Sequence, residues 1–449
     1  MSRLLFAVFQ GGGNLALILP IVKRAVERGH SVRVLAGPGV WRSRAAVRAS
    51  LLERIAAAGA TYVAFEQPGV HPLDEPPAPA GLVLGWTPRA LARGTSYVEP
   101  YRWAPVWAGN VWTELHHVGA DVVVADFLLA GALVGAEAAG VPAASVVHGI
   151  YKHRPAPGVP PFGFGFPPAR GPIGWVRDAF WAAGIQRVYQ RDALPFLNRA
   201  RRQLGLASLR SVYDQFDRSA RVLVLTSQAF DFRAQALPAN VRYVGAPSDD
   251  ASAPPWRSPW SDAESRPFVL VSLSTLQQGQ GPVLARILTA LAHMPVRALV
   301  TLGPSLAQNG FVAPSNVRLE PFVPHAAVLP HVSAMVTQCG AATVAKALTH
   351  GVPLVCMPIL GDQPDNAARV VALGAGVRLN SDASTEQIRR AISQVLDEPR
   401  FRHSAQRLAA TLAREHPADA AVLELEELLR VKYVDSSLLD AAQDRLDRE

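Results

Sequence analysis

Short apolar runs alternate with longer amphipathic stretches along most of the 449-residue chain. A continuous apolar run of this length is typical of a strand that is buried on both faces of a parallel sheet. Such runs are Leu4–Phe9, Ser31–Leu35, Ala60–Phe65, Asp121–Asp126, Val141–Val147, Arg221–Thr226, Phe268–Leu273, Arg297–Thr301, Ala334–Thr337 and Val352–Pro358. Apolar residues at helical spacing follow many of them, as at Leu15–Arg28 and Gly281–His293. The alternation predicts an α/β protein built from parallel βα units.

A stretch rich in proline, serine and acidic residues, 247–266, divides this pattern. It has little apolar periodicity, which is typical of a linker. The sequence therefore predicts a first domain at 1–246, a second domain at 267–421 and a terminal helical segment at 422–449. The chain is long enough for each of the two domains to bury its own core.

Two further stretches of the first domain have a distinct composition. Arg154–Pro172 is dense in proline, glycine and phenylalanine and predicts an irregular loop, which we expect to act as a flexible lid. Asp178–Leu204 carries many arginines and predicts one long helix.

The turn that follows the strand Ala334–Thr337 has the composition of an anion site. Gly340 and the two alanines after it allow the backbone to approach a ligand closely. Thr343 is expected to cap the next helix, whose first N–H groups then point outward and favour a diphosphate.

The next strand ends in a polar loop that contains Asp362, Gln363 and Asp365. Ligands of open α/β sheets bind outside the carboxyl ends of the strands, and paired Asp and Gln side chains suit the hydroxyls of a sugar. An alternative is that Asp362 or Asp365 only caps the following helix, with Pro364 in its first turn.

The glycine turn near the N-terminus allows a second interpretation. Residues 11–16 match the G-x-G-x-x-A pattern of nicotinamide-binding proteins. Such a site requires an acidic residue at the end of the second strand, and that strand ends here in Leu35, Ala36 and Gly37. We therefore reject a dehydrogenase.

The second-domain motifs together resemble those of a known family. The signature is VTQCGAAT, then HGVPLVCMP, then GDQPDNAARV, and it covers about forty residues. On these residues the chain resembles the family-1 glycosyltransferases of the GT-B fold, the group of UDP-glucuronosyltransferases and bacterial antibiotic glycosyltransferases. The resemblance implies two Rossmann-like domains facing a central cleft, with the segment at 422–449 packing back on the first domain. It also implies inverting transfer from a UDP- or dTDP-sugar to an apolar, natural-product-like acceptor, with no metal and no cofactor.

Donor-binding residues follow from the same resemblance. The diphosphate would lie at the turn after the strand, the sugar at the polar loop, and the nucleotide base against an aromatic ring. The corresponding residues here are Ser274, Thr275, Phe322, Val323, Gln338, Gly340, Ala341, Ala342, Thr343, Asp362 and Gln363. Gln338 replaces a family histidine, so it can donate a hydrogen bond to phosphate but adds no charge.

The first domain departs from the family at the catalytic base. Asn14 stands where many members have a histidine, and an amide does not accept a proton at useful pH. Asp126, at a strand end, is then the first choice as base, and His148 is the second. Each also has a structural interpretation: Asn14 as a turn residue, Asp126 as a helix cap and His148 as a hydrogen-bonded core histidine. An acceptor that attacks through carbon or nitrogen would need little base.

The acceptor is expected to contact the first domain at Gly13, Trp86 and Tyr151. Aromatic rings there would flank a flat apolar molecule, although core packing is the commoner role of such side chains.

The composition limits the kinds of partner that the protein is expected to bind. The net charge of +8 comes from scattered arginines, which favours a solvated basic surface over nucleic-acid binding, and any membrane contact is expected to be peripheral. Two cysteines and the absence of a leader-like N-terminus predict a cytoplasmic protein, monomeric or homodimeric. The sequence contains no Asp-x-Asp motif that would suggest a metal site.

Two other functions remain open. One is a degenerate homologue that binds nucleotide-sugar without turnover. The other is a GT-B epimerase, which the acceptor loop and the signature disfavour.

Overall fold

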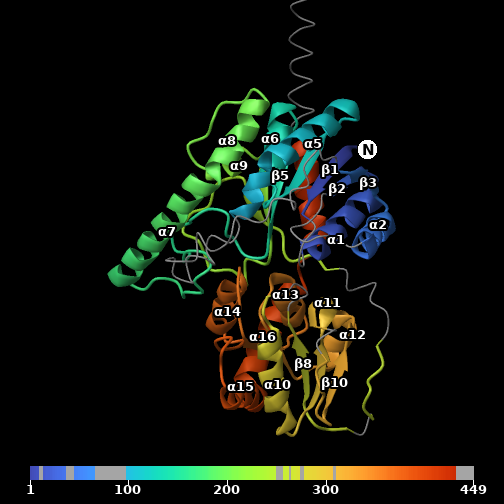
Figure 1. Cartoon of the computed structure of the whole chain (residues 1–449), viewed down its shortest axis with the longest axis vertical. Helices are drawn as coiled ribbons and strands as arrows, with labels where there is room; N and C mark the ends of the chain where they lie inside the picture. Colours follow the sequence, from blue (N-terminus) through green and yellow to red (C-terminus); the bar gives the residue numbers. More distant parts are fainter. Residues whose placement is uncertain are drawn as a thin grey trace, which may run out of the picture.

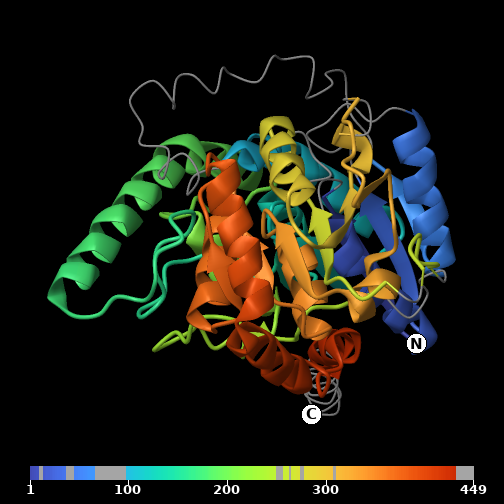
Figure 2. The ribbon, with the colours of Figure 1, turned by 90° about the horizontal axis from the view of Figure 1, so that it is seen from below.

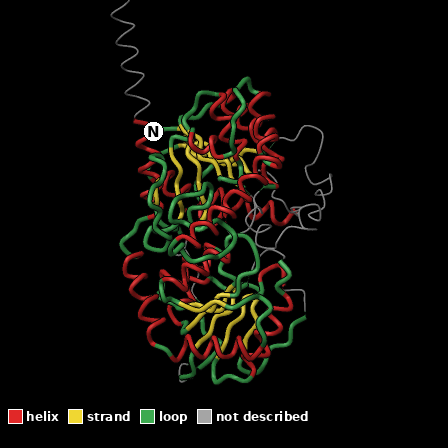
Figure 3. The backbone as a smooth tube through the Cα atoms, turned by 90° about the vertical axis from the view of Figure 1, so that its left-hand side faces the viewer, coloured by secondary structure: helices red, strands yellow, loops and turns green. Residues whose placement is uncertain are grey.

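The computed structural model describes residues 1–9, 14–36, 45–65, 98–248, 256–261, 264–273, 278–306 and 310–430. These residues form two lobes stacked along the longest axis of the molecule (Figure 1). Each lobe contains one sheet with helices around it (Figure 3). The predicted α/β architecture of two Rossmann-like domains is confirmed.

The first lobe is organised around a seven-stranded sheet with the order β3-β2-β1-β4-β5-β6-β7. Its strands are β1 (Arg3–Val8), β2 (Ser31–Ala36), β3 (Thr61–Ala64), β4 (Val122–Asp126), β5 (Ala143–His148), β6 (Arg221–Leu225) and β7 (Val241–Tyr243). Every pairing is parallel. The strand order reverses between β1 and β4, and ligands of such sheets bind beside that point at the carboxyl ends.

Helices cover both faces of this sheet. They are α1 (Asn14–Glu27), α2 (Ala45–Ala57), η1 (Glu99–Trp103), α5 (Ala104–His117), α6 (Ala130–Ala138), α7 (Pro172–Asp192), α8 (Leu194–Gln203) and α9 (Tyr213–Asp217). Leu5 and Ala7 of β1 pack into the core on the α5 and α6 side. Leu4 and Phe6 pack into the other core, with α1. Because both faces are buried, the strands are apolar throughout.

The second lobe contains a six-stranded sheet with the order β10-β9-β8-β11-β12-β13, and all of its pairings are parallel. Its strands are β8 (Phe268–Ser272), β9 (Arg297–Thr301), β10 (Val317–Glu320), β11 (Ala334–Thr337), β12 (Leu354–Cys356) and β13 (Gly376–Arg378). Its helices are α10 (Gly281–Ala292), α11 (Gly303–Leu306), α12 (His325–Val328), η3 (Leu329–His331), α13 (Ala341–Thr349), α14 (Gln363–Ala372), α15 (Thr385–Asp397) and α16 (Pro399–Leu412). The order reverses here between β8 and β11.

The end of the described chain returns to the first lobe. Residues 417–430 are helical and lie in that lobe, in red in Figure 1. Val422 and Leu425 of this helix are fully buried in the core beside α1. Glu426 accepts a hydrogen bond from the Arg28 guanidinium at 2.7 Å. The terminal helix therefore joins the two lobes a second time.

One predicted helix is wrong in its extent. The stretch Asp178–Leu204 was expected as a single helix, but α7 and α8 are separate and Ala193 lies between them. Pro195 lies in the first turn of α8, where its missing N–H and its ring prevent a continuous helix. Helix α7 starts earlier than expected and extends beyond the outline of the second lobe (Figure 2).

Candidate functional site

Three polar side chains meet at the carboxyl ends of β1, β4 and β5, which are neighbours in the first sheet. Asp126 ends β4, His148 ends β5, and Asn14 begins the helix that follows β1. His148 Nε2 lies 2.7 Å from Asp126 Oδ2, and Asn14 Nδ2 donates to the same oxygen at 3.3 Å. The structure therefore unites all three predicted catalytic residues in one cluster.

The hydrogen bonds of this cluster indicate which atoms of Asp126 and His148 donate and which accept. Asp126 is fully buried, and its second oxygen accepts from the backbone N–H of Leu128 at 3.0 Å. With both oxygens engaged, this carboxylate faces protein groups on every side. A carboxylate oxygen accepts hydrogen bonds, so this contact assigns the N–H of the imidazole ring to His148 Nε2. His148 Nδ1 is then an acceptor, and it has no partner among the described residues.

Helix α13 begins directly after the turn that was predicted to hold a diphosphate. Gly340 is its N-cap residue, with Ala341, Ala342 and Thr343 in the first turn. The prediction that Thr343 caps the helix is wrong, because Thr343 lies three residues inside it and no side chain caps this end. The first-turn N–H groups therefore remain available to an anion.

The backbone of this turn is strained. Cys339 has φ of 70°, and it is the only non-glycine residue with positive φ in the described part of the chain. Such a conformation costs about 1–3 kcal/mol and persists only where neighbours enforce it. Asn366 enforces it here, donating from Nδ2 to the Cys339 carbonyl at 2.9 Å. Gln338 is buried before it, with its amide nitrogen beside Gly340.

The polar loop after β12 does not use its carboxylates as helix caps. Asp362 occupies the N-cap position of α14, but its side chain makes no capping hydrogen bond. Instead, Asp362 Oδ2 lies 3.4 Å from Lys152 Nζ of the first lobe. Gln363 turns its amide oxygen inward, accepting from the backbone N–H groups of Ile359 and Leu360 at 2.8 and 3.0 Å. The capping interpretation of this loop is therefore wrong, and Gln363 also shapes the loop itself.

Asp365 connects the same loop to the first lobe. Its carboxylate accepts from the backbone N–H groups of Gly163 and Gly165 at 2.7 and 3.2 Å. Burial raises the pKa of this carboxyl to about 6, although Arg369 and the two N–H groups oppose the shift. Arg378 donates to the Gly165 carbonyl at 2.8 Å. The loop predicted as a lid is thus bound to the second lobe.

A buried ion pair lies beside this contact. Arg369 Nε donates to Asp231 Oδ1 at 2.6 Å, and the two side chains are 3% and 1% exposed. Asp231 also accepts from the backbone N–H of Tyr151 and from the Tyr243 hydroxyl. Neither Arg369 nor Asp231 lies in a sequence pattern that indicates a partner in the other lobe, so the sequence alone did not predict this ion pair. Lys152 was missed for the same reason.

The remaining predicted site residues lie in different environments. Phe322 is 77% exposed, so its ring is accessible for stacking, whereas Val323 is buried. Tyr151 is buried in the core of the first lobe, which raises the pKa of its hydroxyl to about 12. Gly13, Trp86, Ser274 and Thr275 lie outside the described residues.

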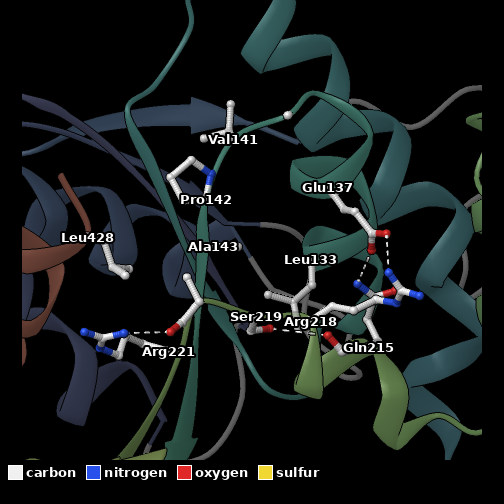
Figure 4. Close-up of a pocket in the computed structure, with 12 residues that line it drawn as sticks. Leu133, Glu137, Val141, Pro142, Ala143, Gln215, Arg218, Ser219, Arg221 and Leu428 are labelled. Atoms are coloured by element: carbon white, nitrogen blue, oxygen red, sulfur yellow. Dashed lines mark hydrogen bonds and ion pairs between the residues drawn. The ribbon is translucent and has the colours of Figure 1, made fainter. Parts of the chain in front are cut away.

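Two of the cavities that border the first lobe differ in their relation to this cluster. One of about 600 Å³ lies along the loop that starts at Ile150 and along α7, and it is lined mainly by apolar side chains, including Trp175. The other, of about 560 Å³, surrounds the start of β5 (Figure 4). In that cavity Glu137 accepts a hydrogen bond from the Gln215 amide at 2.9 Å and lies 3.7 Å from the Arg218 guanidinium. Because the start of β5 is the end of the strand opposite His148, the second cavity is not part of the candidate site.

Within the described ranges, no group of three or more His, Cys, Asp or Glu side chains is arranged to hold a metal ion. In the same part of the chain, no helix has both the length and the apolar character needed to cross a membrane.

The chain is similar to proteins of known activity over most of its length. Residues 210–436 match the family described as UDP-glucoronosyl and UDP-glucosyl transferase. The 4'-demethylrebeccamycin synthase of Lentzea aerocolonigenes is 33% identical over 438 residues, covering 95% of this chain and 99% of that protein. The solved glycotransferase of kitacinnamycin has a TM-score of 0.72 at 19% identity, covering 95% of this chain and 98% of its own. The glycosyltransferase VinC in complex with dTDP has a TM-score of 0.65 at 19% identity, covering 95% and 99%.

Proposed function

The chain belongs to the UDP-glucoronosyl and UDP-glucosyl transferase family, and we propose that this glycosyltransferase transfers a sugar, with inversion and without a metal ion, to an apolar small molecule. The donor would be a UDP- or dTDP-sugar, since the description of the family names UDP and the structure of VinC was solved in complex with dTDP. The name of the rebeccamycin-type relative supports a natural-product acceptor.

The donor would bind mainly to the second lobe. Its diphosphate would lie at the N-terminus of α13, where Gly340 leaves space and the first-turn N–H groups of Ala341 and Ala342 favour negative charge. Asp362 would contact the sugar, and the exposed Phe322 ring would stack on the base. Fixed N–H dipoles stabilise the leaving nucleoside diphosphate in the transition state, so the proposal requires no cation.

The first lobe would supply the base. His148 Nδ1 takes the proton of the acceptor nucleophile. An electron pair of that nucleophile forms the new bond to C1 of the sugar. The bond from C1 to the diphosphate oxygen breaks, and the nucleoside diphosphate leaves with that electron pair. Asp126 holds the Nε2–H tautomer and stabilises the imidazolium, and Asn14 orients Asp126. The observation that carries this assignment is the 2.7 Å contact, which leaves Nδ1 as the unpartnered acceptor among the described residues.

The apolar cavity of about 600 Å³ is the proposed acceptor site. It begins at Ile150, two residues after His148, and Asp365 and Arg369 of the second lobe also line it. Its apolar lining with a few charged groups matches the usual character of small-molecule sites.

The rate of nucleoside diphosphate release tests this proposal. It is measured for the wild type, His148→Ala and Asp126→Asn. The donors are UDP- and dTDP-glucose, and the acceptors are a panel of phenolic and macrocyclic compounds. General-base loss is expected to lower kcat by about 10²–10⁴-fold, while calorimetry shows unchanged donor affinity. His117→Ala, at an exposed histidine at the end of α5, is the matched control and should keep full activity.

Three outcomes would contradict the proposal at different points. Equal turnover by His148→Ala would remove this histidine from the mechanism. Tight donor binding without turnover by the wild type, across the whole panel, would leave a binding protein. Failure of the wild type to bind either donor would overturn the donor assignment.

A further inference from the structure

We propose that Lys152, in the acceptor-binding lobe, is a positioning residue of the donor site that directs the Asp362 carboxylate toward the transferred sugar. The inference rests on the proposed function, because it assigns Asp362 to the sugar. Lys152 would then be a residue of the first lobe that contributes to sugar recognition by the second lobe. The sugar would be recognised only when the two lobes are in contact.

Lys152 is an unusual lysine because its side chain is only 2% exposed. Its ammonium lies 3.4 Å from Asp362 Oδ2. The ammonium also lies 5.1 Å from the centre of the Phe127 ring and 5.7 Å from that of Phe162. Lysine is rarely buried in proteins unless it is paired, and removing one partner of a buried pair is costly. The pair therefore holds both side chains in place.

The chain that leads to Lys152 passes directly through the donor site. Gly149 has φ of 70°, and a Cβ at this position would lie 2.7 Å from the Cβ of Ala341 in the first turn of α13. The same Cβ would lie 3.8 Å from Asp362 Oδ2. The segment therefore begins at the base His148, crosses the diphosphate turn and ends at the sugar carboxylate. Only glycine permits this close approach of the two lobes without displacement.

The direction of the Asp362 side chain depends on this contact. Asp362 occupies a helix N-cap position, yet its carboxylate makes no cap hydrogen bond. The residue two positions later, Pro364, has no N–H to offer it. Lys152 binds Oδ2, and Oδ1, which has no hydrogen-bond partner among the residues that the structure describes, would accept from a sugar hydroxyl. A carboxylate so held is preorganised, which lowers the entropy lost on donor binding.

An interdomain ion pair with no role in the donor site is the alternative, and binding measurements distinguish the two. The probes are UDP, dTDP and their glucose conjugates, measured by calorimetry on the wild type, Lys152→Met and Asp362→Asn. Lys152→Met keeps most of the unbranched side chain and removes the ammonium group, with its charge and its hydrogen-bond donors. We expect about a 10–100-fold loss of affinity for the sugar conjugate, the effect of a lost charged hydrogen bond, and no change for the free nucleoside diphosphate.

Further variants test whether Lys152 acts through Asp362. The double variant should lose no more than Asp362→Asn alone, because both changes remove one interaction. Lys152→Arg, which keeps a cation, should recover part of the loss. Arg378→Met removes another contact between the lobes, the hydrogen bond to Gly165, and should leave the preference for the sugar conjugate unchanged.

The inference fails if Lys152→Met weakens the sugar conjugate and the free nucleoside diphosphate equally, which would indicate a role in holding the lobes together. It also fails if the conjugate binds Lys152→Met as it binds the wild type. If the wild type binds neither conjugate, the proposed function itself is wrong. Thermal unfolding of each variant, measured alongside, identifies any that has not folded.

Discussion

Cys339 shows how the conformation of a single residue shapes the turn at which we propose that the donor diphosphate binds. Its left-handed backbone turns the chain between β11 and α13, and the Asn366 amide holds its carbonyl at 2.9 Å. Asn366 belongs to the GDQPDN segment, which suggested sugar contacts, but its side chain supports the diphosphate turn instead. The motif therefore contains residues that build the site as well as residues that face the ligand.

Asn366→Ala is expected to weaken nucleoside diphosphate binding by about tenfold or more, because the turn loses the bond that holds its strained shape. The unsatisfied buried carbonyl should also lower the free energy of unfolding by about 1–3 kcal/mol. Calorimetry and denaturant unfolding measure the two effects. Asn316→Ala is the control, since Asn316 donates to the carbonyls of Leu291 and Val296 away from the site. It should reduce stability alone, and equal loss of binding in both variants would contradict the assignment.

At the scale of elements, the closest helix packing in the first lobe depends on glycine. A Cβ at Gly131 of α6 would lie 2.1 Å from the Ala104 carbonyl oxygen of α5. A Cβ at Gly135 would lie 2.5 Å from the carbonyl oxygen of Ala108. Because α6 follows the strand that ends at Asp126, this packing also supports the position of the cluster of Asp126, His148 and Asn14.

Gly131→Ala is therefore expected to lower the free energy of unfolding by about 1–3 kcal/mol, since the backbone of α5 must move to admit a methyl group. Gly109→Ala is the matched control within the same helix pair, because a Cβ there meets no atom within 4 Å. That change should raise stability by up to about 1 kcal/mol, as alanine favours helix. Chemical denaturation measures both, and a neutral Gly131→Ala would show that the helices separate easily.

At the scale of the whole molecule, charged and polar groups join the two lobes around the site. Lys152 binds Asp362, Asp231 binds Arg369, and the loop glycines bind Asp365. These contacts hold the proposed base and the proposed donor site, which belong to separate sheets, close to one another. They also place an ionisable group, Asp365, where its charge is costly to bury.

Asp365 predicts a specific dependence of stability on pH. Its pKa in the folded protein is about 6, against an ordinary value of 3.8, so between these values the folded state binds more protons than the unfolded state. The contribution of Asp365 to stability therefore falls as pH rises from about 4 to 6 and is constant above that. The shift of about two pKa units corresponds to about 3 kcal/mol. Arg369 and Asp362 are the charged neighbours that modulate it.

Asp365→Asn removes this titration and keeps the size of the side chain. The stability of the wild type minus that of the variant is expected to decrease by about 2 kcal/mol between pH 4 and pH 7, because part of the full shift lies below pH 4. Denaturant unfolding at intervals across this range measures the difference, in which titrations common to both proteins cancel. A difference that does not change with pH would contradict the raised pKa.

The sequence by itself determined the class of fold, and it located the segment of the second lobe where we propose that the donor binds. Apolar runs, helical spacing and glycine turns depend on residues that are close in the chain, so their patterns predicted both parallel sheets. The signature around Gly340 and Asp362 likewise indicated a diphosphate and sugar site from contiguous residues. Local pattern was insufficient where one proline divided α7 from α8, and where Thr343 proved to lie inside α13.

Only the tertiary structure decided which groups act on one another across the cleft. Lys152 and Asp362 are 210 positions apart, and Asp231 and Arg369 are 138 apart, so no local pattern could pair them. The proposal of His148 instead of Asp126 as base also rests on geometry, because it depends on which atoms are already hydrogen-bonded. Sequence spacing specifies which residues end each strand, but packing of the two lobes specifies which side chains meet there, since those contacts join segments that only the complete fold brings together.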